Sequence, residues 1–78
     1  MTVSVTLFGD LRKYVSRGSP EVQTVSLAED STVADLLRLV GVPAEEEVTP
    51  GLNGELAGRE TVLHEGDAVL LFGPMEGG

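Results

Sequence analysis

The stretch Gly66-Asp67-Ala68-Val69-Leu70-Leu71-Phe72 decides the fold of this 78-residue chain. Glu65-Gly66-Asp67 is a tight-turn signal, and residues 68–72 follow as the longest apolar run of the sequence. A strand with apolar side chains on both faces is expected inside a sheet rather than at its edge. Residues 68–72 therefore predict a central strand, which strands elsewhere in the sequence must flank.

The N-terminal segment predicts two further strands. Val3, Val5 and Leu7 alternate with polar residues, which is typical of a strand that buries one face. Asp10 is then expected to cap a short helix. The apolar face of that helix would consist of Leu11, Tyr14 and Val15. A second strand is expected over residues 22–27, and the most direct pairing for it is a hairpin with the first strand.

The main helix is the clearest element of the sequence. Thr32 and Asp35 have the spacing of a capping box, with Asp in place of Glu. Gly41 supplies the stop signal, and Pro43 prevents the helix from continuing. The apolar stripe that would face the core consists of Val33, Leu36, Leu37 and Val40.

A hairpin is expected at Asn53-Gly54, because both residues tolerate positive φ. The strands beside it, near residues 48–52 and 55–57, would be short, and Pro50 and Gly51 interrupt the first of them. The element order is strand, short helix, strand, main helix and three short strands. This order predicts an α+β fold in which one main helix crosses one face of a mixed sheet of about five strands.

Charge and composition exclude several classes of function. Five Lys and Arg against thirteen Asp and Glu give a net charge of −8, which disfavours binding to nucleic acid and to anionic membranes. The N-terminus lacks the pattern of a targeting signal, and residues 68–72 are far too few to span a membrane, so a cytoplasmic protein is expected. The chain contains no cysteine, which excludes a disulfide, a thiolate metal site and an iron–sulfur cluster.

Few residues could carry catalysis. His64 is the only histidine, and its place beside a predicted turn favours a surface residue over a base or ligand. No phosphate-binding glycine motif occurs. We interpret Glu45-Glu46-Glu47 as a solvated face rather than a metal site or a site for a basic partner. We therefore expect neither a self-sufficient enzyme nor a resident metal or cofactor.

The end of the sequence is the exception. Gly77-Gly78 follows the last predicted strand after the short segment 73–76, Gly-Pro-Met-Glu. In a glycine-rich chain the pair alone is a weak signal, and its position after a strand is what gives it weight. Residues 73–78 are expected to form a flexible tail, which would present a terminal carboxylate on an arm slim enough to thread a narrow channel.

Five segments of the sequence together carry a family resemblance. They are residues 8–12 (Phe-Gly-Asp-Leu-Arg), 32–37 (Thr-Val-Ala-Asp-Leu-Leu), 52–55 (Leu-Asn-Gly-Glu), 63–69 (Leu-His-Glu-Gly-Asp-Ala-Val) and 74–78 (Pro-Met-Glu-Gly-Gly). In this order and spacing they resemble the sulfur-carrier family of the molybdopterin synthase small subunit (MoaD) and the thiamine sulfur carrier (ThiS). The segment before Gly-Gly departs from the molybdopterin branch, and the Asn-Gly hairpin is closer to the thiamine branch.

The resemblance implies a single ubiquitin-like β-grasp domain over residues 1–78, and it implies a mechanism. An E1-like enzyme would use ATP to adenylate the carboxylate of Gly78, and a sulfur donor would displace AMP to leave a thiocarboxylate. The chain most resembles the molybdopterin synthase small subunit, so the thiocarboxylate would donate sulfur in molybdopterin biosynthesis, to an acceptor such as the large subunit of molybdopterin synthase. Catalytic groups would belong to these partners, and the carrier would hold no cofactor. The residues that thread the tail into a partner would be Pro74, Met75, Glu76 and Gly77.

Other functions use the same terminus. Thiamine thiazole synthesis and tRNA thiolation are alternatives within sulfur transfer. A ubiquitin-like modifier would instead join Gly78 to lysines of other proteins. A β-grasp interaction module would leave the Gly-Gly pair without a role.

Strand alternation assigns a docking surface within the implied fold. The first and last strands of a β-grasp sheet are parallel neighbours at its centre, and a single helix can cover only one face. Val69 and Leu71 are assigned to the helix side. The open side would carry Phe8, Leu70 and Phe72, and exposed apolar groups beside a functional tail are expected to bind a partner protein. The alternative is that residues 43–50 fold over this side.

Overall fold

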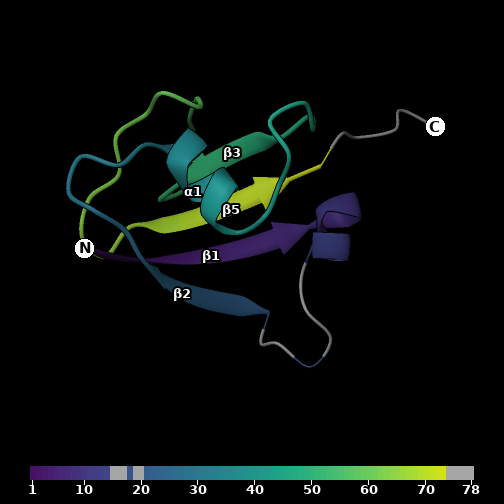
Figure 1. Ribbon diagram of the computed structural model, residues 1–78, viewed down its shortest axis with the longest axis horizontal. Coiled ribbons are helices and arrows are strands. Elements are labelled where there is room, and N and C mark those ends of the chain that lie inside the picture. Colours follow the sequence, from purple (N-terminus) through teal and green to yellow (C-terminus); the bar gives the residue numbers. More distant parts are fainter. Residues whose placement is uncertain (15–17, 19–20, 74–78) are drawn as a thin grey trace.

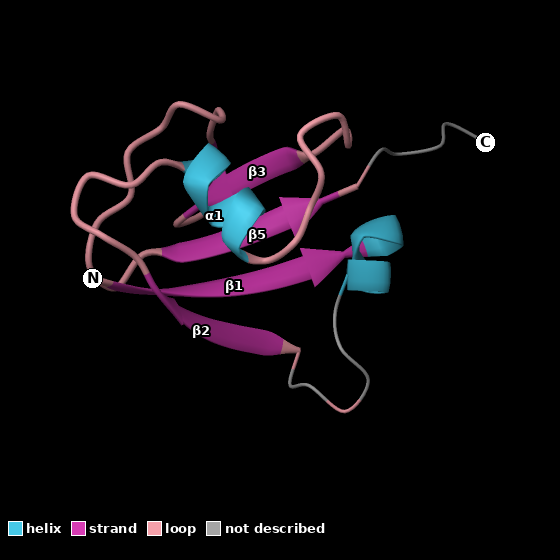
Figure 2. Ribbon diagram, viewed as in Figure 1, coloured by secondary structure: helices cyan, strands magenta, loops and turns pink. Residues whose placement is uncertain are grey.

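The computed structural model describes residues 1–14, 18 and 21–73, which form a five-stranded mixed sheet crossed by one α-helix (Figures 1 and 2). In chain order the elements are β1 (Thr2–Phe8), the 3₁₀ helix η1 (Gly9–Tyr14), β2 (Val22–Ser26), α1 (Val33–Leu39), β3 (Thr49–Leu52), β4 (Glu55–Leu56) and β5 (Ala68–Phe72). Among the described helices, none is long and apolar enough to cross a membrane.

The sheet order is β2-β1-β5-β3-β4, so the apolar strand β5 lies at the centre as predicted. β1 and β5 run parallel, with Ser4 beside Ala68 and Phe8 beside Phe72. The other neighbours are antiparallel, including the predicted hairpin of β1 with β2. The predicted α+β architecture is confirmed.

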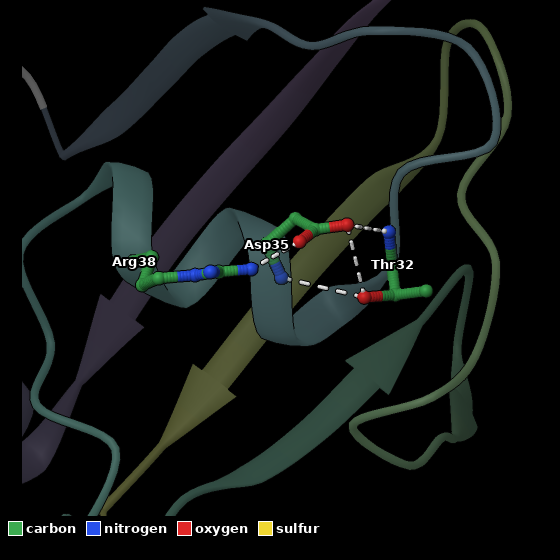
Figure 3. A network of polar contacts seen from close by, with 3 residues as sticks. All are labelled: Thr32, Asp35 and Arg38. Atoms are coloured by element: carbon green, nitrogen blue, oxygen red, sulfur yellow. Dashed lines mark hydrogen bonds and ion pairs between the residues drawn. The ribbon is translucent and has the colours of Figure 1, made fainter.

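Helix α1 begins at a capping box, which Figure 3 shows from close by. The hydroxyl of Thr32 accepts a hydrogen bond from the N–H of Asp35 at 3.4 Å, and the Asp35 carboxylate accepts one from the N–H of Thr32 at 2.9 Å. This second bond is the main cause that lowers the pKa of Asp35, and Arg38 forms an ion pair with the same carboxylate. Gly41, at a φ of 88°, then adopts the left-handed conformation that ends the helix.

The core fills the space between α1 and one face of the sheet. Apolar residues from β1, β5, η1, α1 and two loops meet there: Val3, Val5, Leu7, Leu11, Val33, Leu36, Leu37, Val42, Leu63, Val69 and Leu71. None of them is more than 5% exposed. Each such side chain contributes roughly 1.5–3 kcal/mol on burial, so this one layer supplies the main stabilisation of a small domain.

Two local predictions are wrong. The short helix begins at Gly9, whose φ of 62° turns the chain out of β1, so Asp10 lies inside a 3₁₀ helix rather than capping an α-helix. Leu11 is buried and Tyr14 half-buried as expected, whereas Val15 lies outside the described residues.

Pro50 and Gly51 do not interrupt the third strand but lie inside β3. The carbonyl of Pro50 accepts a hydrogen bond from the N–H of Ala57 at 2.9 Å, so its backbone polar groups face β4. Pro50 has no N–H to donate to the neighbouring strand. Because this position lies where the two-residue strand β4 ends, few hydrogen bonds between β3 and β4 are lost.

Candidate functional site

The candidate site is the face of the sheet opposite α1, together with the end of β5. Phe8 and Phe72 lie side by side on this open face, with ring centroids 4.8 Å apart and ring planes 11° apart. Phe8 is 38% exposed, and Phe72 and Leu70 are half-buried. On the opposite face of the same strand, Val69 and Leu71 are buried. The predicted division of β5 between two faces is confirmed.

The connection from α1 to β3 does not cover this face. Val42 and Ala44 instead line a pocket of about 260 Å³ together with residues of α1. The guanidinium of Arg59 donates to the carbonyl of Glu46 at 2.6 Å and holds the connection on the helix side. The alternative in which residues 43–50 fold over Leu70 and Phe72 is therefore wrong.

Two more apolar residues extend the open face, and sequence analysis missed both. The registers place Val22, Thr6, Leu70, Gly51 and Leu56 in one row across all five strands. Val22 is 53% exposed and Leu56 is 84% exposed. Gly51 places no side chain between Leu70 and Leu56. We call the apolar members of this face the open-face patch; they are Phe8, Val22, Leu56, Leu70 and Phe72.

A hydrogen-bonded cluster holds the start of β5. The carboxylate of Asp67 accepts bonds from the side-chain amide of Asn53 at 3.0 Å and from the N–H of His64 at 2.7 Å. The amide oxygen of Asn53 accepts from the N–H of Ala68 at 2.9 Å. These bonds, with that from Asn53 first, lower the pKa of Asp67. The Asn-Gly and Gly-Asp motifs thus meet in space and fix the β3–β4 hairpin to β5.

His64 is hydrogen-bonded in this cluster through its backbone N–H. Its side chain is 78% exposed and lies 4.0 Å from the Asp67 carboxylate. The interpretation of His64 as a surface residue is confirmed.

A second polar cluster joins η1 to the connection that follows α1. The Tyr14 hydroxyl donates to the carboxylate of Glu46 at 2.7 Å, and the Lys13 ammonium lies 3.3 Å from the same oxygen. The bond from Tyr14 is the main cause that lowers the pKa of Glu46, and it raises the pKa of Tyr14. Glu46 is half-buried and bound to Tyr14 and Lys13, so it is not part of a solvated face. Glu45 and Glu47 are exposed, as expected. Within the described ranges, no group of three acidic, His or Cys side chains could hold a metal ion.

The predicted reactive tail begins where β5 ends. Gly73 is buried directly after Phe72. The threading residues Pro74, Met75, Glu76 and Gly77, and Gly78 itself, lie outside the described residues. Their flexibility and their roles stay predictions.

The model of the ThiS family matches residues 5–78 of this sequence. The chain belongs to the ThiS family. No curated protein matches the sequence. Among solved structures, ThiS from Geobacter metallireducens is 34% identical to this ThiS-family chain, with a TM-score of 0.58. The match covers 96% of this chain and 99% of the Geobacter chain.

Two further structures place the ThiS-family chain among ubiquitin-like β-grasp proteins. SAMP1, small archaeal modifier protein 1 of Haloferax volcanii, shares 29% identity over 100% of both chains with a TM-score of 0.76. A chain from the complex of subunits 1 and 2 of the molybdopterin-converting factor of Helicobacter pylori shares 21% identity over 100% of both chains, with a TM-score of 0.65, and supports the fold alone. The resemblance to sulfur carriers and the β-grasp fold are both confirmed. Small carriers of this type are in general not catalytic themselves.

Proposed function

We propose that this chain is a cytoplasmic sulfur carrier in molybdopterin biosynthesis. Its Gly78 carboxylate is adenylated by an E1-like enzyme and converted to a thiocarboxylate, which donates sulfur to a synthase. The observation that carries the proposal is the family match, which extends over residues 5–78 and so includes the Gly77-Gly78 pair. The exposed patch on the same strand that leads to this pair supports it.

Activation is required by the chemistry of the carboxylate. An α-carboxyl group has a pKa of about 3.5 and is an anion at neutral pH, which makes it a poor electrophile. In the first step a carboxylate oxygen attacks the α-phosphorus of ATP, and pyrophosphate leaves. In the second step hydrosulfide from the donor attacks the acyl carbon, AMP leaves with one of the original carboxylate oxygens and the S–H proton is released, so that this oxygen is replaced by sulfur. The groups that catalyse both steps belong to the E1-like partner.

The contribution of the chain itself is docking. The open-face patch offers two stacked phenyl rings and exposed aliphatic groups immediately before the tail. Aromatic residues at the centre of an apolar patch are favoured anchors of protein interfaces. We infer that Phe8, Leu70 and Phe72 contact the partner while the tail enters its active site. The molybdopterin-converting factor of Helicobacter pylori, whose two subunits form a complex, supports a synthase as one such partner.

One specific observation favours a second function. The similarity to SAMP1 extends over the whole of both chains, and its name describes a protein modifier. In that case Gly78 would form an isopeptide bond with a lysine of another protein. Thiazole synthesis for thiamine is supported in the same way by the similarity to ThiS of Geobacter metallireducens.

Intact-mass measurement tests the proposal. The protein is incubated with its cognate E1-like enzyme, ATP and a sulfur donor, and we expect the mass change for replacement of one oxygen by sulfur. The matched control lacks only Gly78; it should fold as the full chain does and remain unmodified. An unchanged mass with an enzyme that is active on its own carrier would contradict the proposal.

The acceptor is tested separately. The thiocarboxylate form is offered to the large subunit of molybdopterin synthase and to a thiazole synthase, and sulfur loss from the carrier is followed in each. We expect loss only with the former. Lysine adducts in place of sulfur loss would identify a modifier.

A further inference from the structure

The two edges of the sheet differ in how they are protected. Natural sheets shield an edge by shortness, charge, proline or a bulge, because an unpaired strand invites pairing. β4 is such an edge, since it has two residues and one of them is Glu55. β2 has five residues, Val-Gln-Thr-Val-Ser, without charge or proline. Its register with β1 is continuous and therefore contains no bulge. In the described part of the chain, no strand pairs with the outer side of β2.

The hydrogen bonds identify which backbone groups of β2 face outward. The N–H of Leu27 donates to the carbonyl of Met1 at 2.8 Å, and the Met1 ammonium donates to the carbonyl of Leu27 at 2.7 Å. Bonded and non-bonded pairs alternate in an antiparallel ladder, so Val25 and Gln23 are the next residues of β2 bonded to β1. The residues whose N–H and C=O groups point away from β1 are therefore Val22, Thr24 and Ser26.

The side chains of the same three residues are also exposed. They lie on the open face of the sheet, beside Thr6, Ser4 and Thr2 of β1. An added strand would place alternate side chains next to Val22 and Thr24, where apolar and β-branched residues form favourable cross-strand pairs. The outer edge of β2 thus offers outward-facing backbone hydrogen-bonding groups, and its exposed side chains favour apolar or β-branched residues in the added strand.

Acidic residues bracket this uncharged edge. Glu21 precedes β2, Glu29 and Asp30 follow it, and all three are exposed. The Glu29 carboxylate lies 3.6 Å from the Met1 ammonium, whereas no ion pair to Glu21 or Asp30 occurs among the described residues. Two copies paired antiparallel through β2 would bring Glu21 of each close to the acidic residues of the other. A second copy is therefore a poor occupant, and a basic segment is a good one.

We propose that the outer edge of β2 binds an extended segment of a partner protein, with β-branched or apolar residues at alternate positions and basic residues at both ends. The added strand forms main-chain hydrogen bonds with Val22, Thr24 and Ser26. Its basic ends lie beside Glu21 and Asp30. This site shares Val22 with the open-face patch, but it uses the backbone edge of β2 rather than the face of the sheet, and it does not depend on sulfur transfer.

Amide hydrogen exchange tests the site directly. The probe is the peptide Lys-Lys-Val-Thr-Val-Thr-Val-Lys-Lys, added to the full chain at low salt. We expect the outward amides of Val22, Thr24 and Ser26 to exchange fast in the free protein and to become protected with the peptide. The inward amides of Gln23 and Val25 should be protected in both states. The same peptide with Glu in place of each Lys should not bind.

Substitution at one outward residue separates backbone from side-chain binding. Thr24→Pro removes an N–H that faces solvent, a position where an edge strand tolerates proline. We expect it to weaken peptide binding by about ten-fold, the effect of losing one main-chain hydrogen bond. The matched control Thr24→Ala retains the N–H and should bind within about two-fold of the wild type.

A second variant tests the charges if Thr24→Pro does not fold. Glu21→Gln combined with Asp30→Asn keeps the shape of both side chains and is expected to weaken binding by about five-fold at low salt. Equal affinity of the folded Thr24→Pro variant, or of this double variant, would overturn the proposal. Protection of the outward amides by self-association without peptide would overturn the assigned occupant. Loss of sulfur transfer would leave all these results unchanged.

Discussion

Leu70 and Leu71 are adjacent and chemically identical, but they lie on faces of the sheet that serve different purposes. Leu71 is 0% exposed under α1, whereas Leu70 is half-buried on the opposite face, which neither described helix covers. The same contrast separates Leu7 from Phe8 in β1. An apolar side chain in a central strand of this protein can therefore serve stability or recognition, and its face decides which.

The largest expected effect tests the covered face. Leu71→Ala should lower the free energy of unfolding by about 2–5 kcal/mol, because it leaves a cavity in the single core layer. That is a large share of the total of roughly 4–12 kcal/mol expected for a domain of this size. The matched control is Leu70→Ala, for which we expect less than half of the loss. Urea denaturation measures both, and equal losses would mean that the open face is covered.

Phe72→Ala tests the open face. We expect it to weaken binding to the E1-like or synthase partner by about 1–3 kcal/mol, because it removes one of the two stacked rings of the patch. It should cost less folding stability than Leu71→Ala. Calorimetric titration and urea denaturation of the same variant give both quantities. The face assignment fails if partner affinity is unchanged or if Phe72→Ala is the more destabilising of the two.

Asp67→Asn tests the turn that fixes the register of β5. A shift of that register by one residue would move every side chain of β5 to the opposite face of the sheet. Hydrogen bonds in the folded state lower the pKa of Asp67. Its stabilising effect is therefore complete above the unfolded-state pKa of about 3.9 and is lost as pH falls through the folded-state value. At neutral pH we expect the variant to lose about 1 kcal/mol of unfolding free energy.

The acid limb of the stability curve provides the check on this variant. Asp67→Asn should lose stability less steeply than the wild type below about pH 4, because the substituted group no longer titrates. The remaining loss of stability at acid pH should persist in this variant, because the pKa values of Asp35 and Glu46 are also lowered in the folded state. Denaturation at a series of pH values measures it, and an acid slope identical to that of the wild type would show that Asp67 is not stabilised by its partners.

The smallest expected effect concerns the rim of the patch. Leu56 is 84% exposed, so Leu56→Ser should change the free energy of unfolding by no more than about 0.5 kcal/mol. Its effect on partner affinity should be smaller than that of Phe72→Ala, as is usual at the edge of an interface. A stability loss as large as that of Leu70→Ala would show that Leu56 is packed.

Local sequence signals predicted the elements of this fold well. The capping box at Thr32, the stop at Gly41 and the Asn53-Gly54 turn each depend on residues within one or two turns of backbone, and all three occur in the structure. Alternation in β1 and β5 also predicted the two faces, because side chains in a strand must alternate. The prediction for Asp10 was wrong because the chain turns at Gly9, where φ is positive, and the 3₁₀ helix already begins there, before Asp10.

The site was less predictable because it depends on strand register. Val22 joins the open-face patch through its pairing with Thr6 of β1, and Leu56 through its pairing with Gly51 of β3. Alternation within a single strand reveals neither pairing. A hairpin register counted from Asn53-Gly54 places Leu56 opposite Gly51 and could have identified it. The bonds of Asp67 to Asn53 are equally invisible in sequence, because the two residues meet only after β5 enters the sheet.

The parallel pairing of β1 with β5 has a consequence for synthesis on the ribosome. Of the five described strands, the central strand β5 is translated last and its neighbour β1 is translated first. Contacts between such distant segments carry a high entropic cost of loop closure, so they form late. A nascent chain that stops before Ala68 lacks the strand that joins the two halves of the sheet, and it cannot assemble the paired phenyl rings. Folding and the ability to bind a partner are therefore acquired together, once β5 has been made.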